Sequence, residues 1–106
     1  MLNEQIEKET QEEKYKELSH TFEDIWEEKE VTVKARFKKP SPIIIKRMQS
    51  MAAKDTARAA TTLLIDCCHK DDLDSLKANL EKYPATATTL SSVILKACGV
   101  STELGN

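Results

Sequence analysis

Hydrophobic residues recur with a period of two between residues 31 and 38. The apolar positions are Val31, Val33, Ala35 and Phe37, and each is followed by a polar residue. This alternation predicts a half-buried β-strand with a cationic outer face. Pro40 marks its end, because proline cannot donate to a ladder. No second alternating run is evident. Two arrangements therefore stay open: a hairpin with the residues around 25–28, or an edge that pairs with another copy or a partner chain.

Upstream of this strand, apolar residues fall at a helical spacing. They are Tyr15, Leu18, Phe22 and Ile25, at positions i, i+3, i+7 and i+10. The stripe predicts a helix that ends near Glu30, and Thr21 with Asp24 gives a weak capping-box signal inside it. Residues 1–20 are rich in Glu, Lys and Gln, so we expect an acidic head that is a frayed helix or a disordered tail.

Downstream of the strand, start and stop signals predict four short helices. Ser41 is an N-cap with Pro42 at the first helical position. Asp71 or Asp72 caps the third helix, and Gly99 stops the last one. The predicted helices cover residues 42–53, residues 56–69, the segment from these aspartates to Pro84, and residues 85–98.

These elements predict a mainly α-helical fold: a small helical bundle with one short β-strand or hairpin near residues 31–38 and an acidic N-terminal helix or tail. We divide the chain into three regions. The acidic head covers residues 1–20, a single helical domain with the short strand covers residues 21–100, and a C-terminal tail covers residues 101–106.

Charge is distributed unevenly along the chain, although the formal net charge is only −2. Residues 1–30 carry eleven acids against four lysines, whereas residues 31–47 carry six cations and no acid. No apolar run approaches the roughly 20 residues of a membrane span, and the acidic start is unlike a signal peptide. Three cysteines, two of them adjacent, argue against a disulfide framework. We expect a soluble cytoplasmic protein with reduced thiols and no membrane partner.

The run Cys67–Cys68–His69 is the segment that most resembles a reactive site. Adjacent side chains on a helix diverge by about 100°, so these residues do not converge on a zinc ion as structural ligands do. We interpret the cysteines as small buried hydrophobes. The chain has two glycines, both near its end, so a phosphate-binding glycine-rich loop is absent. We predict no enzyme activity, no cofactor and no metal.

The basic segment 34–47 supports an alternative function as a small nucleic-acid-binding regulator. The overall acidity and the acidic segment directly upstream argue against that function, because both would repel a phosphate backbone. The helix over residues 56–69 also carries one arginine and almost no amide side chains for reading bases. Binding to nucleic acid is therefore the less favoured prediction, and a generic protein-interaction module is a third one.

The sequence resembles small tail assembly chaperones of long-tailed bacteriophages and prophages over roughly residues 30–100. The resemblance rests on FKKP (Phe37–Pro40) before a capped helix, then on LLIDCC and on DDLDSLKANLEKYPATATTLSSVILKACG. It implies a non-enzymatic protein that coats the long helical tape-measure protein until tail-tube protein subunits replace it. It also implies many copies along one client, and hence a weak homo-oligomer in the host cytoplasm.

Partner binding is expected along the strand and the first helix of the bundle. The candidate residues are Val33, Arg36, Phe37, Lys39, Pro40, Ile44, Met48 and Met51. Methionines suit surfaces that accept varied apolar partners, although Met48 and Met51 fit a plain core position as well. Trp26 either caps the small core or anchors a partner, and we expect the cap.

Overall fold

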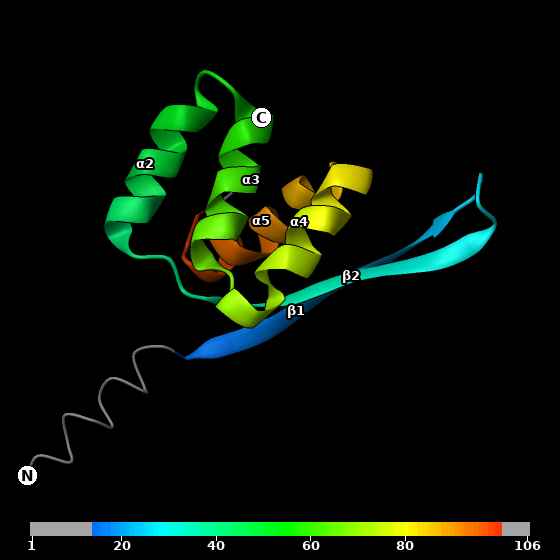
Figure 1. Cartoon of the computed structure of the whole chain (residues 1–106). Helices are drawn as coiled ribbons and strands as arrows, with labels where there is room; N and C mark the ends of the chain where they lie inside the picture. Colours follow the sequence, from blue (N-terminus) through cyan, green and yellow to red (C-terminus); the bar gives the residue numbers. More distant parts are fainter. Residues whose placement is uncertain (1–13, 101–106) are drawn as a thin grey trace, which may run out of the picture.

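The computed structural model describes residues 14–100, which form a long β-hairpin and four α-helices in an α+β arrangement (Figure 1). The hairpin is antiparallel, and its two strands have ten residues each. The elements in chain order are β1 (Tyr15–Asp24), β2 (Lys29–Lys38), α2 (Pro42–Ala52), α3 (Thr56–Cys67), the 3-10 turn η1 (Lys70–Asp72), α4 (Leu73–Lys82) and α5 (Thr86–Ala97).

The prediction of a mainly α-helical bundle is wrong, because the segment expected to be a helix over residues 15–30 is β1 and the hairpin turn. Leu18 pairs with Ala35, and Phe22 pairs with Val31, on the face that the helices cover. Leu18 and Phe22 are four residues apart, so their spacing fits one face of a helix and one face of a strand equally well. His20 lies between them on that face and hides the alternation.

The four-residue turn between the strands is fixed by Asp24. Its Oδ1 accepts hydrogen bonds from the backbone N–H groups of Trp26 and Glu27, both at 3.1 Å. The capping box expected at Thr21 and Asp24 is therefore wrong, and Thr21 instead bonds Thr32 across the strands at 2.9 Å. Glu28 completes the turn with a φ of 54°, a left-handed conformation that a non-glycine residue adopts only at a cost.

The helices predicted after Ser41 are confirmed. The Ser41 hydroxyl accepts from the backbone N–H of Ile44 at 3.3 Å, and Pro42 opens α2. Gly99 has a φ of 92° directly after α5, as expected for a left-handed stop. Asp72 precedes α4 but makes no cap hydrogen bond, because its side chain binds Arg36 instead.

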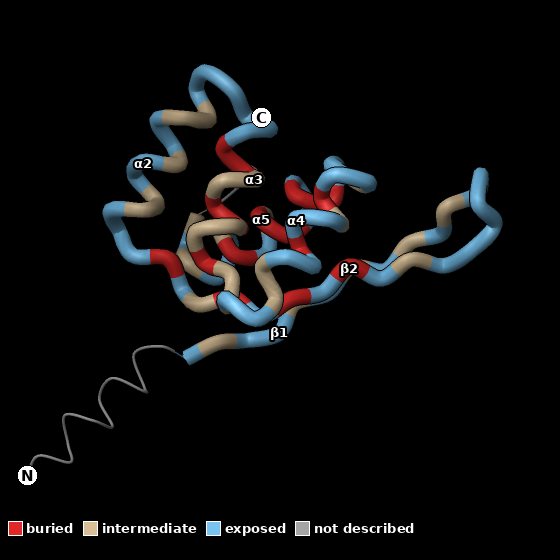
Figure 2. Tube along the Cα trace, in the orientation of Figure 1, coloured by how far each residue is buried: buried red, intermediate tan, exposed pale blue. Residues whose placement is uncertain are grey.

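The core lies between the helices and the half of the hairpin nearest to its open end. Its largest fully buried side chains are Leu63, Leu64, Leu76, Leu90, Val33 and Cys67. α2 contributes no fully buried residue and packs beside α3. The turn end of the hairpin projects beyond the helices and is exposed (Figures 1 and 2). No helix within residues 14–100 combines the length and the hydrophobicity that crossing a membrane requires.

The predicted boundary between head and domain, at residues 20 and 21, falls inside β1. Most of the predicted acidic head and the whole predicted tail over 101–106 lie outside the described residues.

Candidate protein-binding groove and hairpin tip

A groove opens where the open end of the hairpin meets α5. Its volume is about 470 Å³. The apolar lining residues are Leu18, Phe37, Pro40, Val93, Ile94, Ala97 and Cys98, and the polar ones are Lys14, Lys16, Lys38 and Lys39. We call this site the lysine-rimmed groove. Apolar walls with a few polar groups at the rim are typical of sites that bind ligands or peptides.

Local sequence signals account for the apolar wall of the groove. Ile94 and Ala97 lie three residues apart on α5, so they share one side of the helix, and Val93 beside them is 45% exposed. Phe37 is the last inward-facing residue of β2 and is 3% exposed. Pro40 then ends the strand and turns the chain toward α2. The wall therefore combines the edge of the core with partly exposed apolar side chains.

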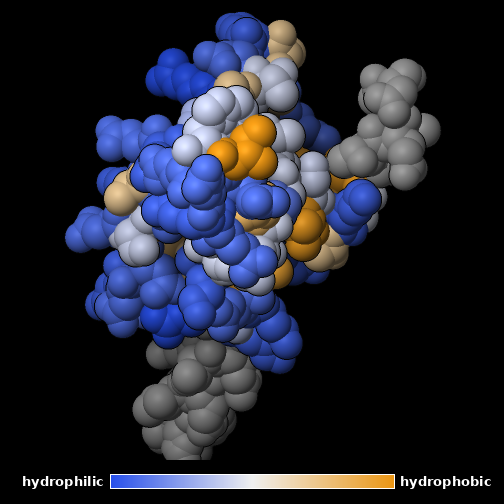
Figure 3. Space-filling view, turned by 90° about the vertical axis from the view of Figure 1, so that its right-hand side faces the viewer, coloured by the Kyte–Doolittle hydropathy of each residue, from blue (hydrophilic) through white to orange (hydrophobic). Residues whose placement is uncertain are grey.

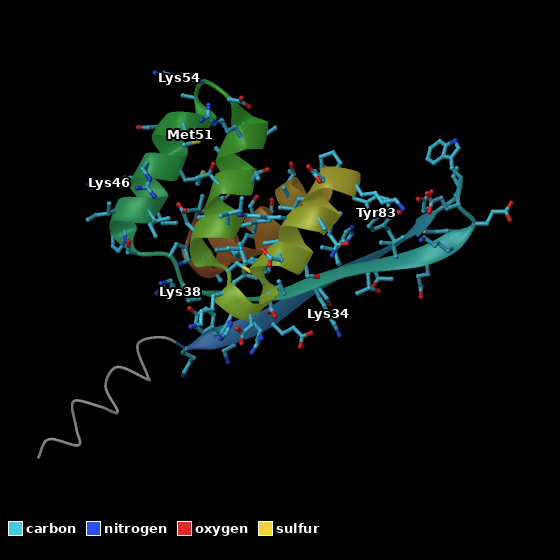
Figure 4. The ribbon with its side chains drawn as sticks, in the orientation of Figure 1. Lys34, Lys38, Lys46, Met51, Lys54 and Tyr83 are labelled. Carbon is cyan, nitrogen blue, oxygen red and sulfur yellow. The ribbon has the colours of Figure 1, made fainter. Side chains whose placement is uncertain are left out.

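The rim of the groove carries a concentrated positive charge. Four lysines and no acid are among the described residues that line it, in a chain whose net charge is −2. Lys38 marks the site in Figure 4, at the end of β2 where the chain leaves for α2. A partner that combines an apolar stripe with carboxylates fits this arrangement best, because each part meets its complement.

The structure brings three of the predicted binding residues together in the groove: Phe37, Lys39 and Pro40. The other predicted residues lie elsewhere. Ile44 and Met48 pack on the core, and Met51 lies between α2 and α3 (Figure 4). Val33 is 0% exposed and its side chain belongs to the core.

Arg36, also predicted to bind a partner, is held by Asp72. The Asp72 carboxylate accepts from the Arg36 backbone N–H at 2.8 Å and from its Nε and Nη2 at 2.9 Å. These hydrogen bonds lower the pKa of Asp72 from 3.8 to about 2. The pair ties the start of α4 to the outer edge of β2.

Sequence reasoning missed the part of the groove that β1 contributes. Lys14, Lys16 and Leu18 line it, but the sequence predicted a frayed helix or a disordered tail for residues 1–20, with Leu18 on a helical apolar stripe. Two signals could have located the site. A ten-residue cationic strand needs a partner strand, and the spacing of Ile94 and Ala97 continues the apolar side of α5 to its end.

A second candidate surface is the turn of the hairpin with its flanking residues 23–30, which we call the hairpin tip. Trp26 is 87% exposed and Ile25 is 62% exposed, so the expectation that Trp26 caps the core is wrong. Seen from the side toward which the tip points, the surface is mainly hydrophilic, with apolar side chains in small separate patches (Figure 3). Of the four large hydrophobic residues that are exposed among the described residues, only Ile25 and Trp26 are adjacent in the sequence.

The end of α4 holds the tip in place. The Tyr83 hydroxyl donates to Asp24 Oδ2 at 2.8 Å, and Lys82 Nζ lies 3.3 Å from Glu27 Oε1. The Tyr83 hydrogen bond, with the backbone N–H of Glu27, lowers the pKa of the Asp24 carboxyl. The tip carries five acids and one lysine, a net charge of −4. Glu23, Glu28 and Glu30 make no ion pair with any described residue.

The outer edge of β2 is partly open. The N–H of Arg36 donates to Asp72 and its carbonyl accepts from His69, so both groups point away from β1. In an antiparallel pair this orientation alternates, so the backbone groups of Thr32 and Lys34 point to the same edge. Within residues 14–100 no group bonds them there. A cavity of about 360 Å³ lies along this edge beside α4.

The cysteines have the environment of packing residues. Cys67 is 0% exposed, and burial raises the pKa of its thiol to about 11. Burial also raises the pKa of the Cys68 thiol. Such thiols stay protonated at neutral pH and are poor nucleophiles. Among residues 14–100 no group of three or more His, Cys, Asp and Glu residues is arranged to hold a metal ion.

Acidic side chains already form ion pairs with three of the six cations in the basic segment 34–47. Lys34 pairs with Glu17 at 3.7 Å, and Arg36 pairs with Asp72 at 2.9 Å. Arg47 pairs with Asp66 at 2.9 Å. A phosphate backbone would have to compete with these carboxylates for three of the six cations.

Comparison with known proteins establishes the family and the fold. The model of the family described as "Domain of unknown function (DUF6848)" matches residues 7–105, so the chain belongs to this family. A solved structure of the uncharacterised protein rbstp2171 from Bacillus stearothermophilus is similar, with a TM-score of 0.70 and 17% identity. The match covers 92% of this chain and 94% of that protein, and at this identity it supports the fold alone. No curated protein matches the chain.

Proposed function

We propose that this member of the DUF6848 family is a phage tail assembly chaperone that holds a segment of the tape-measure protein in its lysine-rimmed groove. The observation that carries the proposal is the groove itself: an apolar wall with four lysines at its rim and no acid among its described lining residues. The resemblance of residues 30–100 to such chaperones supplies the identity of the client.

The proposed mechanism is helix-in-groove binding without catalysis. One apolar stripe of an amphipathic client helix packs on Leu18, Val93 and Ala97, which are the exposed or partly exposed residues of the apolar wall, and carboxylates on its flanks meet the lysines. Burial of the stripe keeps the client from aggregating in the host cytoplasm. Rim charges contribute mainly to the rate of association, so the client remains exchangeable. Tail-tube protein subunits can then take its place.

The alternative of a nucleic-acid-binding regulator receives less support. It relies on residues 34–47, where Asp72, Glu17 and Asp66 already occupy three cations. The chaperone proposal uses Lys14, Lys16 and Lys39, for which no partner among the described residues is found.

Co-expression with a phage tape-measure protein tests the proposal, with the soluble fraction of the client as the readout. Wild type should raise that fraction, and the double variant Lys16→Glu/Lys39→Glu should raise it at least about tenfold less, because it reverses two rim charges. Lys54→Glu/Lys77→Glu is the matched control, since both lysines are exposed and lie outside the groove.

If the control variant fails as the groove variant does, the effect is one of net charge. If the groove variant performs like wild type, the groove does not bind the client. Either result contradicts the proposal.

A further inference from the structure

We infer that the hairpin tip of one copy binds in the lysine-rimmed groove of a second copy, so that the protein associates head to tail. The tip (residues 23–30) offers two exposed apolar side chains surrounded by acids, and the groove offers an apolar wall surrounded by lysines. Each surface thus combines an apolar centre with a surrounding charge that is opposite to the charge of the other.

The charges of the two surfaces are matched in size and opposite in sign. The tip has a net charge of −4, and the residues that line the groove sum to +4. Glu23, Glu28 and Glu30 have no cation partner among residues 14–100, so they are available to the lysines of another copy. Complementary charges around a tryptophan anchor are typical of the centre and rim of a protein interface.

The tip cannot occupy the groove of its own chain. Residues that line the groove lie at the open end of the hairpin, and the tip lies at the other end of two ten-residue strands. At about 3.4 Å per residue the two sites are about 30 Å apart along a straight ladder. In Figure 1 the tip lies beyond the helices, at the end of the hairpin opposite to its open end. The groove that receives a tip must therefore belong to a second copy.

The tip is also preorganised for binding. Asp24 fixes the turn through two backbone N–H groups, and Tyr83 holds Asp24 from the end of α4. Lys82 adds a contact to Glu27 on the other side of the turn. An anchor that is already ordered loses little conformational freedom on binding. The backbone of Trp26 is thus held at a fixed place, while its side chain, 87% exposed, is open to a partner.

The contact uses two different surfaces of the same chain, so it is heterologous. Such contacts form rings or open chains and do not stop at a closed dimer.

The same contact would also regulate access of the client to the groove, and this point rests on the proposed function. The tip of another copy occupies the site until an acidic amphipathic client segment displaces it, which protects the apolar wall while no client is bound.

Analytical ultracentrifugation of the full chain tests the inference without any client. Wild type should show a mass that rises with concentration, with a dissociation constant on the order of 100 μM, as small interfaces give. Trp26→Ala and Lys16→Glu/Lys39→Glu should each weaken association at least about tenfold. Lys54→Glu/Lys77→Glu should associate like wild type. Thermal unfolding of each variant shows whether it is folded.

Mixing the two defective variants provides the decisive observation. The Trp26→Ala variant keeps an intact groove, and the groove variant keeps an intact tip, so together they should form a one-to-one complex that neither forms alone. Wild type that stays monomeric up to about 1 mM overturns the inference. So does a folded Trp26→Ala variant that associates like wild type, or a mixture that remains monomeric.

The outcomes of this experiment and of the co-expression experiment are separable. Trp26→Ala leaves the groove intact, so it should still solubilise the tape-measure client as wild type does. Loss of self-association with retained client binding supports both proposals. Retained client binding by a wild type that does not self-associate ends the inference alone. Self-association without client binding ends the proposed function alone.

Discussion

At the scale of single residues, the contact between Arg36 and Asp72 explains how the helices are fixed to the hairpin. Asp72 receives three hydrogen bonds from Arg36, one of them from the backbone, and the pair closes the β2 edge beside η1. Sequence alone suggested two other roles, a partner contact for Arg36 and a helix cap for Asp72. Neither residue carries a local signal for the other, because 36 positions separate them and only the tertiary fold brings them together.

Asp72→Asn should destabilise the protein at neutral pH. It should also remove the part of the pH dependence of stability that comes from ionisation of Asp72. Hydrogen bonding to Arg36 lowers the pKa of Asp72 from 3.8 to about 2, so folding favours the ionised form. The contribution of this carboxylate is therefore complete above pH 3.8 and is lost as the pH falls toward 2. The difference in unfolding free energy between wild type and variant should shrink over this range.

Urea denaturation at several pH values measures this difference. Asp71→Asn serves as the control, because the Asp71 side chain is 67% exposed and its carboxylate lies 3.9 Å from the His69 imidazole, beyond hydrogen-bond distance. A gap between wild type and Asp72→Asn that stays constant down to pH 2 would mean that the ion pair does not form in solution.

At the scale of elements, the helices after residue 41 could be predicted from sequence and the first strand could not. Ser41, Pro42 and Gly99 determine where a helix starts or stops through local backbone geometry. Their effect can therefore be predicted from the sequence alone. β1 has no such signal. The spacing of its apolar residues fits both the period of a helix and the period of a strand. Pairing with β2 decides which of the two forms.

The same limit applies to the groove. Phe37, Lys39 and Pro40, which were predicted to bind a partner and do line the groove, belong to the strand that the sequence predicts and to its end. Lys14, Lys16 and Leu18 were missed, since their position depends on the register between β1 and β2. Ile44 and Met48, also predicted to bind a partner, are partly buried and pack on the core, and Met51 is partly buried on the same helix.

Proline substitutions at neighbouring positions test whether residues 15–24 form a strand with this register. Because the backbone groups of Arg36 point outward, His20 and Val33 form a hydrogen-bonded pair, and the N–H of Ser19 points to the outer edge. His20→Pro removes a ladder hydrogen bond and leaves the carbonyl of buried Val33 without its donor. It should therefore cost about 2 kcal/mol more than Ser19→Pro.

Chemical denaturation of both variants gives the comparison. In a helix over residues 15–30 the two prolines would be about equally disruptive. Equal losses of stability would therefore contradict the assignment of β1.

At the scale of the whole molecule, the two proposed binding surfaces lie at the two ends of one hairpin. The lysine-rimmed groove lies at the open end, where the helices cover the sheet, and the acidic tip with Trp26 projects from the other end (Figures 1 and 2). Within the described residues, formal charge changes along the hairpin from four lysines at the groove to a net charge of −4 over residues 23–30 at the tip. This polarity suits a protein that acts in many copies along one client.

The most direct test of this account is an NMR titration of the labelled protein with a helical tape-measure peptide whose apolar stripe is flanked by Asp and Glu. We predict that the largest shifts of backbone signals occur at Leu18, Phe37 and Ile94, which line the groove, and that raising the salt concentration weakens the binding. Saturable shifts confined to α2, or no shifts at millimolar peptide, would contradict the assignment of the groove as the client site.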